Sequence, residues 1–580
     1  MGLFHSKLDS GSDDEWEPNV SSRLSHVGEA VYQELPMKYS KYRHKMWNAT
    51  FSAMVGSLQQ TPSVKTFTEN LELTKDPPHS NGFVDKMFDV MSKTTKWCDF
   101  MSLAPPYEGG KDDYFLKKMK EALKNVAGNA KGKEPIIVRL MFGWGYGESH
   151  PPRFGPIDCD LWMKKFTEEL PEDANIQLWV GAWRYGQSWN HAKIIAVDGK
   201  YLHTGGHNVW SKSYLENKPV HDISIEMEGH ATHDAHLFSN TQWEWIQYRR
   251  GTFWGRILSS IPSWVPMLTF HRADISEYPI GRQLRFPPLY KRSIVDKYKP
   301  SSVSVPVFSV GRQAALVDGF SAFFSRDQPA AVADAAFVAM FGSATNTIRM
   351  SLQDLGPAGG PKYGRLGGLI LGWPTEYFKP MVRAILKRGV VIQIVLSNRK
   401  TPENSFGYPI NEVYSKIIKC MKKEFPNEVT NTILKEEIIG KKLCISYIRH
   451  KGGNTYYQDE KEEPEEDNEI YNHPKFIIID DVCSYTGSQN LYRSDLAEWG
   501  IIIDDADITA GMMEDYWNPL WKASHNEDDY NVEKIMESLE DDTDNDEVVF
   551  NPYTFGGKKK IEEIVRALNE GEAPRCAGRN

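Results

Sequence analysis

Two segments far apart in the chain repeat the same spacing of residues that can carry out acid, base and nucleophilic chemistry. The copies are His191-Ala-Lys193-Ile-Ile-Ala-Val-Asp198 with Gly205-Gly206-His-Asn208, and His473-Pro-Lys475-Phe-Ile-Ile-Ile-Asp480 with Gly487-Ser488-Gln-Asn490. Both fit the pattern H-x-K-x4-D-x6-G-(G/S)-x-N without insertion or deletion. One copy would arise by chance in about one chain in 10⁴, because five positions are fixed at about one residue in twenty. Two copies therefore indicate a functional motif.

The residue types of this motif suit an anionic ester of phosphate. A lone H-x-K would more often be a satisfied core histidine beside a lysine that reaches the surface. On a strand, a histidine and a lysine two apart project from one face. Glycine and serine let the backbone approach an anion, lysine and asparagine donate hydrogen bonds, and two histidines supply a nucleophile and a proton carrier. The duplicated motif thus predicts a phosphodiester site.

The expected reaction needs no cofactor. One neutral imidazole attacks phosphorus while the other, protonated, gives its proton to the departing alcohol; water or an alcohol then releases the phosphohistidine. Four lysine and asparagine donors oppose the charge on the phosphoryl oxygens. We therefore expect no metal ion, and a bell-shaped pH–rate curve that belongs to the pair of histidines.

Two sets of alternating strands and helices must position these residues. In the first set the expected strands are Phe100–Ala104, Ile136–Phe142, Ile176–Trp183, Ala192–Val197 and Ile223–Met227, with helices at Phe83–Lys96, Tyr114–Val126 and Leu161–Leu170. In the second set they are Thr347–Leu352, Val390–Leu396, Leu443–Ile448, Phe476–Ile479 and Gly500–Ile503, with helices at Ala330–Phe341 and Tyr377–Lys387. Such alternation is typical of an α/β fold with a largely parallel sheet. The repeated order predicts two lobes of one architecture.

The domain boundaries follow from changes in composition. Residues 1–80 are expected to be an irregular, partly disordered extension, and residues 81–300 the first lobe, with a long connection from about 250 to 302. Residues 301–525 are expected to form the second lobe. Residues 526–580 are expected to be an acidic tail, with a short helix at Lys558–Leu568.

Charge and composition exclude several other classes of protein. The formal net charge is −10, from 68 basic and 78 acidic residues, so the overall field disfavours nucleic acid as a partner. The acid gathers at 13–17, 459–469 and 527–547, in runs typical of solvated segments. The 6 cysteines show no zinc spacing or close pair. We also expect no membrane-spanning segment and no secretion signal.

The chain resembles the HKD phospholipase D superfamily, and its pattern is closest to the secreted bacterial enzymes. The resemblance runs from about Lys96 to Ile503 and includes SLAPP (102–106), SWNHAKIIAVDGK (188–200), HDISIEMEG (221–229), VPVFSVG (305–311), ISYIRH (445–450) and GSQNLY (487–492). It implies two α/β/α sandwich lobes that face each other across a pseudo-twofold axis. Each lobe would contribute one motif to a single cleft.

The resemblance also implies a role for each motif residue. His191 resembles the nucleophile and His473 the general acid and base. Substrate phosphate would be bound by Lys193, Lys475, Asn208 and Asn490, and the carboxylates that orient the imidazoles would be Asp222 and Glu498. The bacterial enzymes more often have aspartate at the second of these positions, so Glu498 departs from the pattern. Asp198 and Asp480 complete the signature and are grouped with the catalytic residues, although their positions at strand ends favour a structural role.

The function implied is hydrolysis of phospholipid head groups to phosphatidic acid, with transphosphatidylation. The expected partners are phospholipid at a membrane surface and small alcohols, and the protein is expected to be a monomer. The motif reads the phosphodiester and not its substituents, so a nuclease or another HKD phosphodiesterase is the main alternative. A non-catalytic, membrane-associated protein with the same fold is a third.

The first residues, Met1-Gly2-Leu3-Phe4-His5-Ser6, fit the signal for N-myristoylation of Gly2. A cytoplasmic protein that binds membranes peripherally is therefore expected. One acyl chain binds only marginally, and the basic cluster from Lys38 to Lys45 could supply a second signal.

Two other groupings are not assigned to the site. His230, His233 and His236 recur at intervals of three, but they are expected to be structural rather than metal ligands. The glycines from Gly143 to Gly147 lack the spacing of a nucleotide-binding loop, and a flexible loop near the cleft is expected there.

Overall fold

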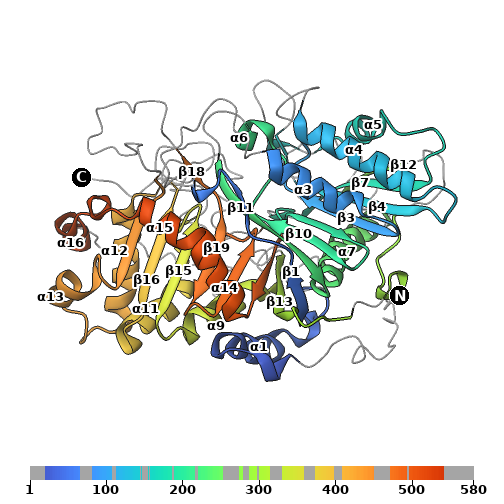
Figure 1. The fold of residues 1–580 in the computed structure, drawn as a ribbon. Coiled ribbons are helices and arrows are strands. Elements are labelled where there is room, and N and C mark those ends of the chain that lie inside the picture. Colours follow the sequence, from blue (N-terminus) through green and yellow to red (C-terminus); the bar gives the residue numbers. More distant parts are fainter. Residues whose placement is uncertain are drawn as a thin grey trace, which may run out of the picture.

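One mixed sheet runs through the molecule and joins both sets of expected strands (Figure 1). The computed structural model describes residues 20–65, 81–106, 113–143, 145–146, 154–155, 157–185, 188–215, 220–251, 273–278, 286–296, 299–313, 330–357, 373–397, 408–449, 470–492 and 496–540. From edge to edge the main strands are β17 (Leu443–Tyr447), β16 (Val391–Leu396), β15 (Thr347–Leu352), β19 (Lys475–Ile479), β20 (Cys483–Gly487), β21 (Glu498–Ile503), β13 (Val305–Gln313), β1 (Trp47–Met54), β11 (Val220–Gly229), β10 (Tyr201–Gly205), β9 (Ile194–Val197), β3 (Trp97–Ser102), β4 (Ile136–Phe142), β7 (Ile176–Tyr185) and β12 (Ala273–Tyr278).

The two halves of this sheet repeat one strand order. In the first half β3, β4 and β7 are parallel, and β9, β10 and β11 follow in antiparallel pairs from β3. In the second half β15, β16 and β17 are parallel, and β19, β20 and β21 follow from β15 in the same way. The expected α/β class is therefore confirmed, but the sheet is mixed rather than largely parallel.

Burial on both faces explains why the motif strands are continuous apolar runs. In β9, Ile194 and Ala196 belong to a hydrophobic cluster that contains Trp243 of α7 (Ala231–Gly251). Their neighbours Ile195 and Val197 belong to a separate cluster with α3 (Asn81–Ser92) and α4 (Tyr114–Asn129). Successive side chains point to opposite faces of a strand, so helices cover both faces of the sheet here.

The remaining helices and short strands complete these layers. Packed on the second half are α9 (Val332–Ser343), α11 (Thr375–Arg388), α12 (Ile410–Glu424) and α14 (Ala506–Met512). Smaller elements are α5 (Cys159–Thr167), α6 (Ser211–Leu215), α13 (Asn431–Ile433), α15 (Asn518–Ser524), β2 (Gln59–Thr61), β5 (Gly145–Tyr146), β6 (Phe154–Gly155), β8 (Ser188–Trp189), β14 (Ala330–Ala331) and β18 (Tyr471–Asn472). Across the described ranges, no helix is long and apolar enough to cross a membrane.

The expectation of an irregular extension over residues 1–80 is wrong for much of this region. The chain forms α1 (His26–Tyr39) and β1, and β1 lies in the middle of the sheet between β13 and β11. The polar residues of β1 suggested a loop, but they are buried and hydrogen-bonded: Asn48 Nδ2 donates to Asp234 at 3.2 Å, and Ser52 Oγ accepts from the backbone of Ala231 at 3.1 Å. Hydrogen-bond partners inside the protein thus allow the polar side chains of this strand to be buried.

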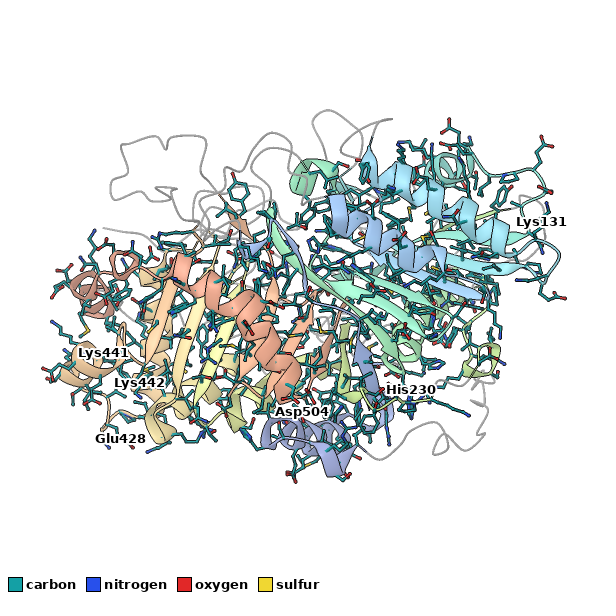
Figure 2. The ribbon with its side chains drawn as sticks, in the orientation of Figure 1. Lys131, His230, Glu428, Lys441, Lys442 and Asp504 are labelled. Carbon is teal, nitrogen blue, oxygen red and sulfur yellow. The ribbon has the colours of Figure 1, made fainter. Side chains whose placement is uncertain are left out.

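The start of α1 is fixed to the second half of the sheet. Ser25 caps the helix, and its backbone N–H donates to Asp504 at 2.7 Å. Figure 2 shows Asp504 directly beside α1. The segment that contains α1 and β1 is therefore part of the folded core.

The expected acidic tail is also partly wrong. Part of this region forms α16 (Val532–Glu540), which packs against α12 and buries Ile535 and Met536. The acidic residues lie on an amphipathic helix here, and their number in the sequence obscured the apolar face of that helix. The helix expected at Lys558–Leu568 lies outside the described residues.

Candidate active site

Both motifs lie at the starts of equivalent strands. His191 and Lys193 lie in the three residues before β9, and His473 lies two residues before Lys475, the first residue of β19. The expectation that each histidine and lysine share one strand is therefore wrong in detail. All four side chains are nevertheless nearly enclosed: the residues are 7%, 5%, 7% and 1% exposed, in chain order.

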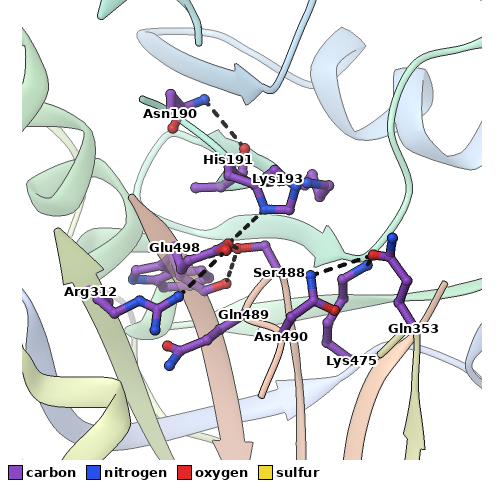
Figure 3. A network of polar contacts seen from close by, with 12 residues as sticks. Asn190, His191, Lys193, Arg312, Gln353, Lys475, Ser488, Gln489, Asn490 and Glu498 are labelled. Atoms are coloured by element: carbon purple, nitrogen blue, oxygen red, sulfur yellow. Dashed lines mark hydrogen bonds and ion pairs between the residues drawn. The ribbon is translucent and has the colours of Figure 1, made fainter. Parts of the chain in front are cut away.

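Each motif histidine is bound by a carboxylate that follows the other motif. His191 Nδ1 lies 2.9 Å from Glu498 Oε2, and His473 Nδ1 lies 2.6 Å from Asp222 Oδ2. Figure 3 shows the first of these pairs. The sequence predicted both carboxylates but not this exchange between the halves. Because Nδ1 is occupied in both rings, Nε2 is the atom left for chemistry.

Backbone contacts repeat the exchange. The N–H of His191 donates to the carbonyl of Ala497 at 2.9 Å, and the N–H of His473 donates to the carbonyl of His221 at 2.8 Å. Each acceptor directly precedes the carboxylate that binds the same ring. Each half thus fixes the motif of the other at two points, which makes the site a joint product of both halves.

Burial dominates the charge state of both histidines. It lowers the pKa of His191 to about 4 and that of His473 to about 3, although the paired carboxylates oppose this shift. Burial alone would raise the pKa of Asp222 and Glu498, but the adjacent imidazoles outweigh it and hold both below the usual range. The carboxylates are therefore anionic at neutral pH, and each Nδ1–H donates to its carboxylate.

Each motif lysine donates a hydrogen bond to the backbone of its own histidine and acts electrostatically on the histidine of the other motif. Lys193 Nζ donates to the carbonyl of His191 at 2.7 Å, and Lys475 Nζ donates to the carbonyl of His473. Burial lowers the pKa of Lys193 to about 8 and that of Lys475 to about 7. Each lysine also lowers the pKa of the other motif's histidine, which places both motifs in one electrostatic site.

Each motif asparagine has a side-chain oxygen that can still accept a hydrogen bond. Asn208 Oδ1 and Asn490 Oδ1 are buried without a hydrogen-bond partner among the residues that the structure describes. Asn490 Nδ2 donates to Tyr492 at 2.9 Å and to Gln353 at 3.5 Å, and Lys475 Nζ lies 3.4 Å from the same Gln353 oxygen (Figure 3). Gln353 was missed from the sequence because it lies outside the motif, at the end of β15.

The glutamate that departs from the family pattern has a local explanation. In the second motif Ser488 Oγ donates to Glu498 Oε2 at 2.5 Å. In the first motif Gly206 occupies this position, and a Cβ there would lie 2.0 Å from Asp222 Oδ1. Asp222 instead accepts from the Tyr214 hydroxyl at 2.9 Å. The glycine or serine of each motif is thus matched to the carboxylate beside it.

The carboxylates of Asp198 and Asp480 bind backbone N–H groups and not the rings of the motif histidines. Asp480 Oδ2 also lies 2.8 Å from Nε2 of His26, the first residue of α1. Asp198 accepts the N–H groups of residues 95, 96 and 97 at 2.8, 2.9 and 2.7 Å. Asp480 accepts those of residues 345, 346 and 347 at 2.7, 2.7 and 2.8 Å. Both adopt positive φ, 54° and 53°. Their geometry supports the structural role that the strand-end positions predict, and not the grouping with catalytic residues.

Two of the three histidines at 230, 233 and 236 have polar side-chain partners. His233 Nδ1 lies 2.6 Å from the Tyr290 hydroxyl, and His236 Nδ1 lies 2.6 Å from Asp99. Within the described ranges, no group of three or more His, Cys, Asp or Glu residues is placed to hold a metal ion.

No protein-family model matches the chain. A phospholipase D from Streptomyces antibioticus is 22% identical over 470 residues, which cover 78% of each protein. The resemblance to the HKD phospholipase D superfamily is confirmed. Among solved structures, phosphatidylserine synthase from Haemophilus influenzae Rd KW20 is 12% identical, with 89% of this chain and 97% of that chain covered and a TM-score of 0.44. Nuc, a phospholipase D family member from Salmonella typhimurium, is 20% identical, with 33% and 86% covered and a TM-score of 0.18.

The hydrogen bonds of Asp480, the aspartate of the second motif, lead to a prediction about stability. Asp480→Asn is expected to lower the free energy of unfolding by about 2 kcal/mol, because an amide replaces an anion that accepts several backbone N–H groups. Burial opposes ionisation of Asp480, but these N–H groups hold its pKa below the ordinary value of an aspartate. The stabilisation is therefore present above that value and lost as pH falls through the folded-state pKa.

Urea unfolding at neutral and acidic pH measures this effect. Asp481→Asn is the matched control, since its side chain is exposed and is paired with Arg349, and it should cost less than about 0.5 kcal/mol. Equal losses in the two variants would contradict the structural role of Asp480.

Proposed function

We propose that this chain is a phospholipase D-type phosphodiesterase with one active site built from both motifs. The observation that carries the proposal is the reciprocal pairing of His191 with Glu498 and of His473 with Asp222. It gives two imidazoles with free Nε2 atoms, fixed tautomers and buried cationic donors beside them. The superfamily resemblance supports phosphodiester chemistry at such a site.

In the first step His191 Nε2 attacks phosphorus and the bond between phosphorus and the head-group oxygen breaks. His473 Nε2 gives its proton to that oxygen. In the second step His473 takes a proton from water or an alcohol, whose oxygen bonds to phosphorus as the bond to His191 breaks. A bound phosphodiester anion offsets the charges of Lys193 and Lys475, so it raises the pKa of His473 toward the value a proton donor needs.

The proposed substrate is phospholipid at a membrane surface, the product phosphatidic acid, and the alternative acceptors small alcohols. We further propose a monomer whose two halves are lobes related by a pseudo-twofold axis. The matching strand orders and the reciprocal contacts support this relation. Cytoplasmic location and peripheral membrane binding belong to the same proposal. Gly2 lies outside the described residues, so its acylation stays a prediction.

Competition between acceptors tests the function. With phosphatidylcholine vesicles and added ethanol, phosphatidylethanol is expected to appear at the expense of phosphatidic acid while choline release continues, because both acceptors share one intermediate. A chelator should not slow the reaction. Thin-layer analysis of the lipids provides the measurement.

Other products would contradict specific parts of the proposal. Phosphatidic acid alone at high ethanol would indicate direct attack by water. Diacylglycerol would place cleavage on the other side of phosphorus. Cleavage of single-stranded DNA without lipid turnover would identify a nuclease.

A further inference from the structure

The two carboxylates that bind the motif histidines face different side chains across the sheet. In the antiparallel pair of β13 and β21, Glu498 lies opposite Arg312. In the pair of β2 and β11, Asp222 lies opposite Thr61. Arg312 is only 1% exposed, so its charge is inside the protein. Glu498 therefore has a buried cation opposite it on the neighbouring strand, whereas Asp222 has a neutral hydroxyl there.

Arg312 lies close to the oxygen of Glu498 that does not bind His191. Its Nη2 lies 3.9 Å from Glu498 Oε1, which has no hydrogen-bond partner within the described part of the chain. The other oxygen, Oε2, is taken by His191 and Ser488. Figure 3 shows His191 and Arg312 converging on Glu498 from different sides. Arg312 and His191 thus act on different oxygens of Glu498, and the arginine does not displace the histidine.

A second anion holds the arginine in place. Arg312 Nη1 donates to Asp334 Oδ1 at 3.0 Å, and the hydroxyl of Tyr377 donates to the same oxygen at 2.5 Å. Asp334 lies in the first turn of α9 and Tyr377 in α11. Both helices therefore fix the guanidinium against the site.

A fixed cation beside Glu498 stabilises the carboxylate anion and opposes a positive charge on the ring that it binds. Because the carboxylate and the imidazole titrate as a coupled pair, Arg312 lowers the proton affinity of the pair as a whole. At Asp222 the corresponding position is filled by Thr61, whose hydroxyl lies 3.0 Å from His207 Nε2. The pair formed by Asp222 and His473 has no arginine at this position.

We propose that Arg312 is a positioning residue that acts through Glu498 to keep His191 uncharged and ready for attack, while Thr61 leaves His473 free to become the proton donor. The assignment of attack to His191 rests on the proposed function. The effect of Arg312 on the protonation of His191 does not. The charged groups that act on this pair are Lys193, Lys475 and Arg312, and the Tyr485 and Tyr492 hydroxyls lie in the field of Glu498. Asp334 and Tyr377 act on Arg312.

The test is the pH dependence of Arg312→Gln. The acid limb of kcat, where His191 of the substrate complex loses its proton, is expected to move up by about one pH unit, which lowers kcat about tenfold below the limb. The basic limb should stay in place. Histidine NMR titration of the protein without substrate should show the same upward shift for His191 and no comparable shift for His473. Arg312→Lys, which retains the charge, should restore the acid limb.

Controls separate this effect from a general loss of structure. Arg349→Gln removes a partly buried arginine of the second half, which contacts Thr347 and Asp481, and should leave the acid limb in place. If Arg312→Gln does not fold, the double variant Arg312→Gln/Asp334→Asn removes the unpaired partner charge and carries the same expected shift.

An unmoved acid limb and an unmoved His191 titration in a folded variant would overturn the proposal, as would an equal shift at His473. If the wild-type protein cleaved no phosphodiester, the proposed function would fail. The NMR titration would still decide the role of Arg312.

Discussion

Replacing His191 with alanine is expected to lower phosphodiester turnover by about 10⁴-fold or more, because the variant has no atom in place of Nε2 to form the covalent intermediate. The fold should persist, since the other contacts between the halves remain. Turnover of phosphatidylcholine and circular dichroism measure the two quantities. His203→Gln is a suitable control: this buried histidine contacts Gln59 and should alter turnover less than tenfold.

Covalent labelling identifies the nucleophile directly. Substrate labelled on its phosphate should leave acid-labile label on the wild-type protein. The label should persist in His473→Ala with a substrate whose leaving group needs no proton. Label retained by His191→Ala would show that the nucleophile has been assigned to the wrong ring.

Asp222→Asn is expected to lower turnover by about 10³-fold to 10⁴-fold, with the loss at the step that needs a proton from His473. An amide beside Nδ1 favours the wrong tautomer and no longer stabilises the imidazolium. Since this defect concerns the leaving group, a p-nitrophenyl phosphodiester should recover most of the lost rate of the first step. Single-turnover kinetics with the two substrates measure the recovery.

Glu498→Gln provides the matched comparison. It perturbs the ring that attacks phosphorus, so an activated leaving group should recover much less of its rate. The crossed pairing is the reason: Asp222 follows the first motif but binds the histidine of the second. Equal recovery in both variants would contradict the division of roles between the rings.

Several features of this site were predictable because they depend on short sequence spacings. The interval between His191 and Asp198 fixes where the turn after β9 meets the chain before β3, and the second motif repeats this arrangement. The interval to Gly206 is likewise fixed, because a side chain there would overlap Asp222. Local geometry of this kind is preserved in the sequence as a motif.

Other features depended on partners that are distant in the chain. The polar strand β1 resembled a loop because its buried hydrogen-bond partners, such as Asp234, lie far away in the sequence. The amphipathic α16 was hidden by its acidic residues, since the surface of α12 that it covers is known only from packing. In both cases tertiary contacts outweighed the local pattern.

The sequence by itself determined the α/β class, the duplicated motif and the identity of the residues that meet at the site, because each follows from local periodicity or fixed spacing. Only the tertiary structure decided which carboxylate binds which histidine, that Gln353 joins Lys475 and Asn490, and that Arg312 lies across from Glu498. These contacts join segments of opposite halves or separate strands. Their register is set by the packing of the whole sheet, and no short spacing in the sequence records it.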